Sequence, residues 1–159
     1  MIELRKISIT DDNMKECIEL EVAPEQRNFV AGNAVSLGQA YDLNKRGGHA
    51  MPYAIYADGV MVGFVMYEFM LYETEDTYGE DCYYFWRFMM DKNHQGKGYG
   101  RQALAQIIDE IKQFPCGKVD YCYTSYEPTN VAAKRLYESF GFVETGQIVE
   151  GEAVARLKL

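Results

Sequence analysis

The stretch Asp91-Lys92-Asn93-His94-Gln95-Gly96-Lys97-Gly98-Tyr99-Gly100-Arg101 joins an almost wholly apolar segment, residues 82–90, to a segment with helical periodicity. Three glycines lie within five residues, so the backbone can approach a ligand without interference from Cβ atoms. The first amides of a helix are unpaired and lie at the positive end of its dipole, where they bind phosphate or pyrophosphate. Lys97 and Arg101 add positive charge beside them. The stretch therefore predicts a phosphate-binding loop between a buried strand and a helix.

Two common nucleotide-binding loops do not fit this stretch. The Walker pattern GxxxxGK[ST] is absent, and a dinucleotide fingerprint needs a third glycine at position 101, where Arg101 stands. Asp120 lies at a suitable distance for a ribose contact, but it falls inside a predicted strand instead of at its end. Neither nucleotide site is therefore favoured.

Two amphipathic helices are predicted on the C-terminal side of the loop. Apolar residues of segment 104–111 recur at i, i+3, i+4 and i+7, which indicates a helix that starts near Gly98 and that Pro115 ends. Segment 119–123 predicts a strand. Asn130 is typical of a helix N-cap, and the helix after it has one apolar face of Ala133, Leu136, Tyr137 and Phe140 and a stop at Gly141.

The N-terminal third predicts a strand and two helices. The strand carries Ile2, Leu4, Ile7 and Ile9, and Thr10 and Asp11 can cap a short helix with Met14, Cys17 and Ile18 on one face. Segment 21–32 has weak local preferences and is interpreted as a surface loop. A second helix has Asn33 as its cap, an apolar stripe of Leu37, Ala40 and Tyr41, and a stop at Gly47-Gly48.

Two hairpins complete the pattern. Asp58-Gly59 is a strong turn signal between strands 53–57 and 60–71, and segments 142–149 and 153–157 predict a terminal hairpin. The acidic stretch after the first hairpin is typical of a solvated loop. The order of elements indicates one mixed α/β layer without repeats or linkers.

Composition excludes several classes of function. The net charge of −8 at pH 7 argues against a nucleic-acid partner, because phosphate binding needs a basic surface. The four cysteines form no CxxC motif and only two histidines are present, so no metal site is expected. No signal peptide and no apolar run of about 18 residues is found, so we expect a cytoplasmic protein without a membrane partner.

A second motif accompanies the glycine loop. The loop carries Gln95-x-x-Gly98-x-Gly100, and segment 130–142 reads Asn-Val-Ala-Ala-Lys-Arg-Leu-Tyr-Glu-Ser-Phe-Gly-Phe. With both motifs, the chain resembles the GNAT superfamily of N-acetyltransferases over essentially its whole length. The resemblance implies a single GNAT domain over residues 1–159, with a mixed central sheet of about six to seven strands and about four helices.

The resemblance also implies the cosubstrate and its contacts. Acetyl-CoA is the expected acyl donor, held by its pyrophosphate on the main-chain amides of the loop. Asn130 would contact the pantetheine arm, and the small Ala133 would leave room for it. The end of the central strand would pair with pantetheine, and an amide near Met89 would polarise the carbonyl. The implied cofactor-binding residues are Phe88, Met89, Met90, Gln95, Gly96, Lys97, Gly98, Tyr99, Gly100, Arg101, Asn130 and Ala133.

Acetyl transfer to an amine needs an acid and a base. Tyr137, in the position of the family's tyrosine, is the expected general acid for the leaving thiolate, although it also completes an apolar helix face. Alkyl amines have pKa values near ~10.4, so a base or a water relay must deprotonate the acceptor. Some relatives that acetylate polyamines carry a Glu in the first half of the central strand, where this chain has Tyr84-Phe85-Trp86-Arg87. The base is not identified; a water relayed by Tyr83, Tyr84, Glu73 or Glu75 is an open alternative.

The acceptor is the least determined part. The N-terminal half is similar to bacterial spermine/spermidine acetyltransferases, which implies a polyamine and direct attack in a ternary complex. The substrate-binding candidates are Glu25, Glu73, Glu75, Tyr84 and Trp86, which offer carboxylates and cation–π contacts. Alternatives are a peptide or protein amine, an aminoglycoside, or a CoA-binding sensor or interaction module without turnover. A homodimer is an open alternative for the assembly.

Overall fold

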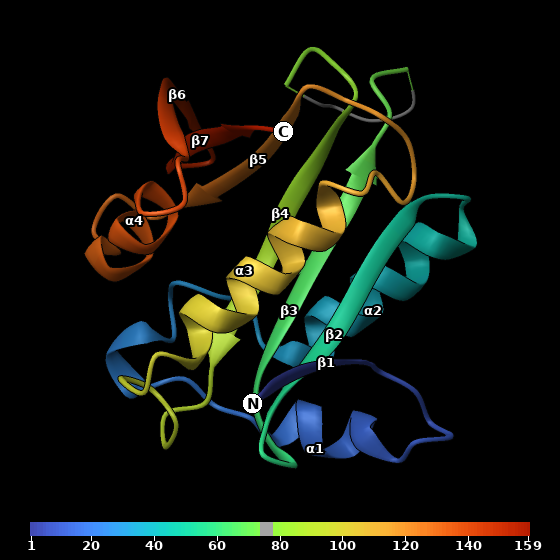
Figure 1. The fold of residues 1–159 in the computed structure, drawn as a ribbon, viewed down its shortest axis with the longest axis vertical. Helices are drawn as coiled ribbons and strands as arrows, with labels where there is room; N and C mark the ends of the chain where they lie inside the picture. The colour runs from blue at the N-terminus through green and yellow to red at the C-terminus, as the bar shows by residue number, and fades with distance from the viewer. Residues whose placement is uncertain (74–77) are drawn as a thin grey trace.

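The computed structural model describes residues 1–73 and 78–159. Within these residues the chain forms one sheet, four α-helices and a short 3-10 turn (Figure 1). The elements in order are β1 (Ile2–Lys6), α1 (Asn13–Glu19), η1 (Pro24–Gln26), α2 (Asn33–Lys45), β2 (His49–Ala57), β3 (Val60–Met70), β4 (Cys82–Met90), α3 (Tyr99–Ile111), β5 (Tyr121–Tyr126), α4 (Val131–Glu138), β6 (Val143–Val149) and β7 (Glu152–Lys158).

The sheet is mixed and has seven strands in the described part of the chain, in the order β1-β2-β3-β4-β5-β7-β6. All neighbouring strands are antiparallel except β4 and β5, which are parallel. The predicted turn between β2 and β3 is confirmed, since Asp58 and Gly59 have φ values of 50° and 84°. The mixed α/β fold with about six to seven strands and four helices is therefore confirmed.

Helices cover both faces of the sheet, with α3 and α4 on one face and α1 and α2 on the other (Figure 1). The first face buries the apolar stripe of α3, including Leu104, Ile107 and Ile111. The second buries Cys17 and Ala40 against Phe64 and Met66 of β3. None of the helices in residues 1–73 and 78–159 has the length and apolar character that a membrane span requires.

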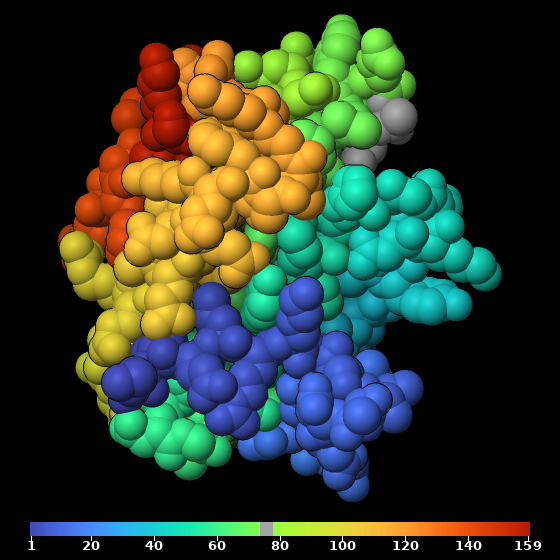
Figure 2. All heavy atoms as spheres, turned by 45° about the vertical axis from the view of Figure 1, so that its right-hand side comes forward, coloured from blue at the N-terminus to red at the C-terminus, as the bar shows by residue number. Residues whose placement is uncertain are grey.

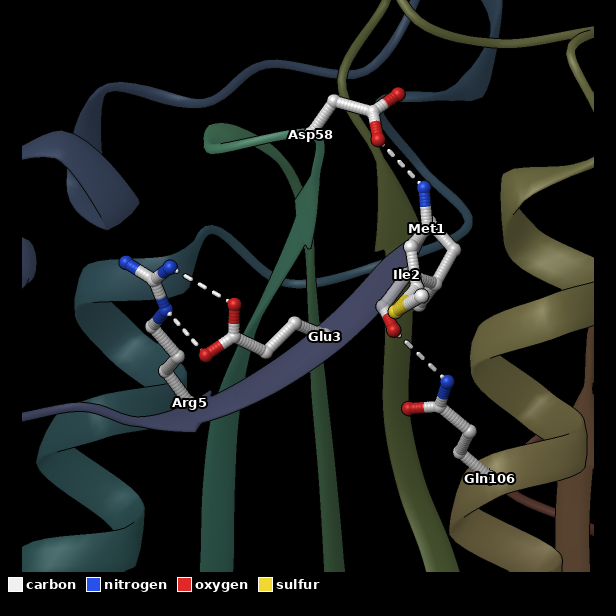
Figure 3. Close-up of polar contacts among 6 residues, drawn as sticks. All are labelled: Met1, Ile2, Glu3, Arg5, Asp58 and Gln106. Atoms are coloured by element: carbon white, nitrogen blue, oxygen red, sulfur yellow. Dashed lines mark hydrogen bonds and ion pairs between the residues drawn. The ribbon is translucent and has the colours of Figure 1, made fainter.

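Helix α3 is also fixed to the edge of the sheet. The Gln106 side chain donates from Nε2 to the carbonyl of Ile2 at 2.9 Å (Figure 3). The Met1 amino group pairs with Asp58 at 2.5 Å, and Arg5 donates two hydrogen bonds to Glu3. Figure 2 shows α3 packed against the N-terminal residues on this side of the molecule. The Gln106 bond holds the helix that begins at the glycine loop against β1.

The N-terminal helices differ from the sequence-based expectation. Helix α1 begins at Asn13, after Asp12 in the left-handed region, and not after a cap at Thr10 or Asp11. Asn13 is buried, and its side chain is hydrogen-bonded to the preceding backbone. It accepts a hydrogen bond from the Ser8 N–H and donates one to the carbonyl of Lys6. These bonds fold the chain back from β1, so the first turn of the helix comes later than predicted.

The predicted apolar stripes of these helices are correct only in part: Cys17 and Ala40 are buried and Leu37 packs against them, but the remaining large residues are not. Ile18 is 44% exposed and Tyr41 is 69% exposed. On α2, Asn33 and Ser36 are buried beside the predicted Ala40. Asn33 lies in the first turn, not at the cap, and donates to the carbonyl of Cys17 at 2.8 Å. This buried polar contact between α1 and α2 determines which face turns inward.

The Glu110 carboxylate on α3 accepts hydrogen bonds from two buried tyrosine hydroxyls. We expect removal of this carboxylate to destabilise the fold. The hydroxyls of Tyr53 and Tyr67 donate to Oε1 of Glu110 at 2.7 and 2.5 Å. Burial raises the pKa of both tyrosines, and the hydrogen bond to Glu110 raises it further. Both hydroxyls therefore keep their protons and donate hydrogen bonds. In Glu110→Leu both donors lose their acceptor, and the free energy of unfolding should fall by about 3 kcal/mol in urea titrations.

Two further variants make this measurement specific. Glu110→Gln keeps an acceptor oxygen and should lose only about 1 kcal/mol. Asp109→Leu changes an exposed neighbour on the same helix and should lose less than about 0.5 kcal/mol. Equal losses for Glu110→Leu and Asp109→Leu would contradict the proposed role of Glu110.

Candidate functional site

The parallel strands β4 and β5 separate part of the way along the sheet. Their pairing spans only Tyr83–Phe85 against Cys122–Thr124, and no described pair continues to Met90. On the other side of β4, Met66 pairs with Arg87 and Tyr67 with Phe85, which leaves Trp86 as an extra residue in a β-bulge. The bulge bends β4 where the strands part. The β5-facing edge of residues 88–90 is therefore without a strand partner in the described structure.

The opening between the strands leads into a groove beside the glycine loop, which we call the loop groove. It is a cavity of about 490 Å³ between the end of β4, the loop, the start of α4 and the segment before α2. Its lining includes ten of the predicted cofactor-binding residues: Phe88, Met89, Met90, Gln95, Gly96, Gly98, Gly100, Arg101, Asn130 and Ala133. The structure thus brings together residues separated by more than a quarter of the chain.

The backbone of the loop has the properties of an anion-binding site. Gly96 and Gly98 have φ values of 74° and 77°, in the region that disfavours side chains, and a Cβ at either would meet open space. Among the described residues, no backbone N–H from Gln95 to Arg101 donates a hydrogen bond to another group. Because these amides precede and begin α3, they present partial positive charge to the groove.

The side chains of the loop hold it in place. Gln95 donates from Nε2 to Oε1 of Gln26 at 2.7 Å and to the carbonyl of Met90 at 3.0 Å, so it ties the loop to η1 and β4. Arg101 reaches across to Ser139 at the end of α4, at 2.8 Å. Lys97 and Tyr99 are not part of the groove lining: Lys97 donates to the carbonyl of Asn93, and Tyr99 packs against the main core.

The start of α4 forms the opposite wall. Oδ1 of Asn130 accepts from the backbone N–H of Ala133 at 3.2 Å, which confirms the predicted N-cap. Asn130 and Ala133 line the loop groove and also a second cavity of about 630 Å³, which we call the splay pocket. The two cavities also share Phe88 and Leu136, so they adjoin at the bulge of β4.

Tyr137 lies in the wall of the splay pocket. Its ring is buried and contacts Phe85, Tyr126 and Phe142, with ring centroids 5.4 to 5.9 Å apart. Burial raises the pKa of Tyr137, and the neighbouring Thr124 hydroxyl acts in the opposite direction. The phenol therefore stays protonated at neutral pH.

The splay pocket contains polar groups that the sequence did not indicate. Three carboxylates, Glu127, Glu150 and Glu152, line it together with Arg87. Arg87 donates to the carbonyl of Trp86 and to Gln39, and its guanidinium lies 5.2 Å from the Trp86 ring centre. Its Nε is buried and has no hydrogen-bond partner among the described residues. This set was missed because these residues come together only through the sheet.

The predicted substrate-binding residues are divided between two regions. Tyr84 and Trp86 line the splay pocket. Glu25 is exposed in η1 and lines neither cavity. Glu73 is exposed beyond the end of β3, next to the start of β4, and lines neither cavity. Glu75 lies outside the described residues.

Segment 21–32 is more than the surface loop that was expected, because Val22, Gln26, Phe29 and Val30 line the loop groove. Its position is fixed by hydrogen bonds from Lys92 N–H to the Glu21 carbonyl at 2.7 Å and from Gln95 to Gln26.

Within residues 1–73 and 78–159, no three His, Cys, Asp or Glu side chains are grouped so that they could hold a metal ion.

Comparisons with known proteins agree on one family. The sequence model of the Acetyltransferase (GNAT) family matches residues 15–142. The chain is 32% identical to a probable spermine N(1)-acetyltransferase of Bacillus subtilis subsp. natto (strain BEST195) and 31% identical to a spermine/spermidine N(1)-acetyltransferase of Bacillus subtilis (strain 168), each over 92% of this chain and 93% of the relative. In fold it is similar to the PaiA N-acetyltransferase of Thermoplasma acidophilum solved with coenzyme A, with a TM-score of 0.70 at 14% identity over 100% of this chain and 99% of that chain.

Proposed function

The chain belongs to the acetyltransferase (GNAT) family and is an acyl-CoA-dependent N-acetyltransferase, and we propose that its acceptor is a polyamine such as spermidine or spermine. The observation that carries the proposal is the splay pocket, whose lining combines Tyr137 with three carboxylates and with aromatic side chains that include Tyr84 and Trp86. The charged side chains of its lining are Glu127, Glu150, Glu152 and Arg87. Three negative charges and one positive charge give the pocket a formal net charge of −2. A pocket of this kind attracts an elongated cation.

The loop groove fits the acyl donor. The free amides of residues 95–101 and the left-handed Gly96 and Gly98 suit a pyrophosphate, and the edge of residues 88–90 that has no strand partner in the described structure suits an amide-containing arm. The bound cosubstrate supplies an activated thioester carbonyl. We assign the amides of the loop to pyrophosphate binding, the edge of β4 to the pantetheine arm, and a main-chain amide of this edge, near Met89, to polarisation of the carbonyl.

The adjoining cavities support direct transfer in a ternary complex. Asn130 and Ala133 belong to both linings, so a donor in the loop groove and an amine in the splay pocket meet at the bulge of β4. We assign Tyr137 as the general acid for the leaving thiolate, because it lines the pocket and stays protonated. Trp86 and Tyr84 offer ring faces to the cationic parts of the acceptor.

Arg87 favours a second candidate acceptor. A half-buried guanidinium with an unused Nε–H is suited to a carboxylate, and Arg pairs with carboxylates through two parallel hydrogen bonds. An amine that also carries a carboxylate, such as an amino acid, would use this group, whereas a polyamine would not.

We expect an acceptor panel to separate these candidates. CoA release should be measured with spermidine, spermine, an α-amino acid, an aminoglycoside and a short peptide. The proposal predicts a kcat/KM for a polyamine at least about tenfold above every other acceptor. Arg87→Gln should preserve or improve polyamine use, because it removes a repulsive charge.

Two outcomes of the panel would contradict the polyamine. A preference for the amino acid that Arg87→Gln abolishes would establish the second candidate instead. Binding of acetyl-CoA without CoA release for any amine would contradict amine acetylation altogether.

A further inference from the structure

Three side chains form a hydrogen-bonded chain along one wall of the splay pocket. The Tyr84 hydroxyl and Oγ of Ser125 lie 2.7 Å apart, and the Ser125 hydroxyl donates to Oε2 of Glu152 at 2.5 Å. Tyr84 comes from β4, Ser125 from β5 and Glu152 from the start of β7, so the chain crosses three adjacent strands. Tyr84, Ser125 and Glu152 also all line the pocket.

The protons in this chain have a single consistent order. An ionised carboxylate only accepts, so the one proton of the Ser125 hydroxyl is used by Glu152. Tyr84 must then be the donor in its contact with Ser125, so its phenolic oxygen is the accepting end of the chain, toward the Tyr78 hydroxyl and the groups of the pocket. Every proton in the chain therefore points from Tyr84 toward Glu152. This is the arrangement that a proton relay ending at Glu152 requires.

Other charged and titratable groups surround the chain. Arg87 lies on β4, with Glu68 of β3 close enough to influence it. The Tyr78 ring lies 5.9 Å from that of Tyr84. Tyr137 faces the same pocket from α4, and Glu127 and Glu150 line it from the loops after β5 and β6. Burial raises the pKa of Tyr84, so this phenol stays protonated and conducts a proton instead of acting as an anionic base.

We propose that Tyr84, Ser125 and Glu152 form the relay that deprotonates the acceptor ammonium. An ammonium N–H passes its proton to the Tyr84 oxygen, the Tyr84 proton moves to Ser125, and the Ser125 proton moves to Glu152. One N–H bond breaks and one O–H bond forms at Glu152. The amine keeps the electron pair with which it attacks the thioester carbonyl. The proposal rests on the proposed function, because it places an amine in the splay pocket.

The test compares pH profiles of conservative variants with spermidine as acceptor. Ser125→Ala and Glu152→Gln should each lower kcat about 100-fold at pH 7 and leave the KM for acetyl-CoA unchanged. Because these variants depend on amine that is already neutral, their kcat should rise about tenfold per pH unit toward the amine pKa near ~10.4, more steeply than in the wild type. The double variant should lose no more than either single variant, because the residues act as one unit.

Two comparisons separate the relay from other roles. Glu150→Gln removes a carboxylate from the same pocket without interrupting the chain, and should raise the acceptor KM with a wild-type pH profile. If Ser125→Ala unfolds, Tyr84→Phe interrupts the chain at its pocket end and carries the same expectation. A kcat loss of equal size at pH 7 and pH 9.5 would overturn the relay. A wild type that releases no CoA with any amine would overturn the proposed function, and the relay with it.

Discussion

Replacing Tyr137 with phenylalanine is expected to lower kcat by about 100-fold or more with a polyamine acceptor, while the KM for acetyl-CoA stays within about twofold. The reason is that the phenol lies in the wall of the splay pocket and, because burial raises its pKa, still carries its proton at neutral pH when the thiolate leaves. The ring itself packs against Phe85, Tyr126 and Phe142, and phenylalanine preserves those contacts. Steady-state kinetics with separately varied donor and acceptor measure both quantities.

A neighbouring tyrosine provides the control for this variant. The Tyr126 ring is stacked on that of Tyr137 at 5.8 Å, but its hydroxyl donates to Glu144 at 2.9 Å. Tyr126→Phe therefore removes a phenol hydroxyl from the same aromatic cluster and should change kcat by less than about threefold. Thermal unfolding of both variants checks the fold. A similar loss of kcat in both variants, or a matched loss of acetyl-CoA affinity in Tyr137→Phe, would reject the acid role.

Sequence reasoning succeeded where one local pattern determines the structure. The apolar period of segment 104–111 identifies α3, whose Leu104, Ile107 and Ile111 are buried as predicted. The Asn130 cap is formed by a hydrogen bond to the backbone N–H of Ala133, only three residues further along the chain. The glycines of the loop indicate a backbone with positive φ values, which other residues adopt only with strain. Each of these features is decided within a few residues, so the sequence alone reveals it.

Features that depend on contacts between residues far apart in the chain were missed, because no local pattern encodes them. Segment 21–32 joins the groove through a hydrogen bond between Gln95 and Gln26, 69 residues apart. Ser125 and Glu152 come together because β5 and β7 pair with Ser125 opposite Val154, a register that no local pattern reveals. The buried polar face of α2 follows from the contact of Asn33 with α1. The groove was therefore predictable in part, and the polar wall of the splay pocket was not.

A charge introduced into the glycine loop is expected to have a similarly large effect on donor binding. In Gly98→Asp, a carboxylate would stand among the free amides at the start of α3, where we place the pyrophosphate. Gly98 has a φ of 77°, and Asp and Asn are the side chains that tolerate this region best. The KM for acetyl-CoA should rise about 30-fold or more, because one more negative charge opposes the phosphates within a few ångströms. The dissociation constant of CoA should rise in parallel.

Gly98→Asn is the matched control, because it has nearly the same shape and backbone preference without the charge. The Cβ of either residue would meet open space, so neither should disturb the core. Gly98→Asn should raise the KM for acetyl-CoA by less than about fivefold, and the ratio between the two variants isolates the electrostatic effect. That ratio should shrink as salt is added, since screening weakens charge repulsion. Equal KM values for the two variants would mean that the pyrophosphate does not lie on this loop, and would remove the main argument for placing the donor in the loop groove.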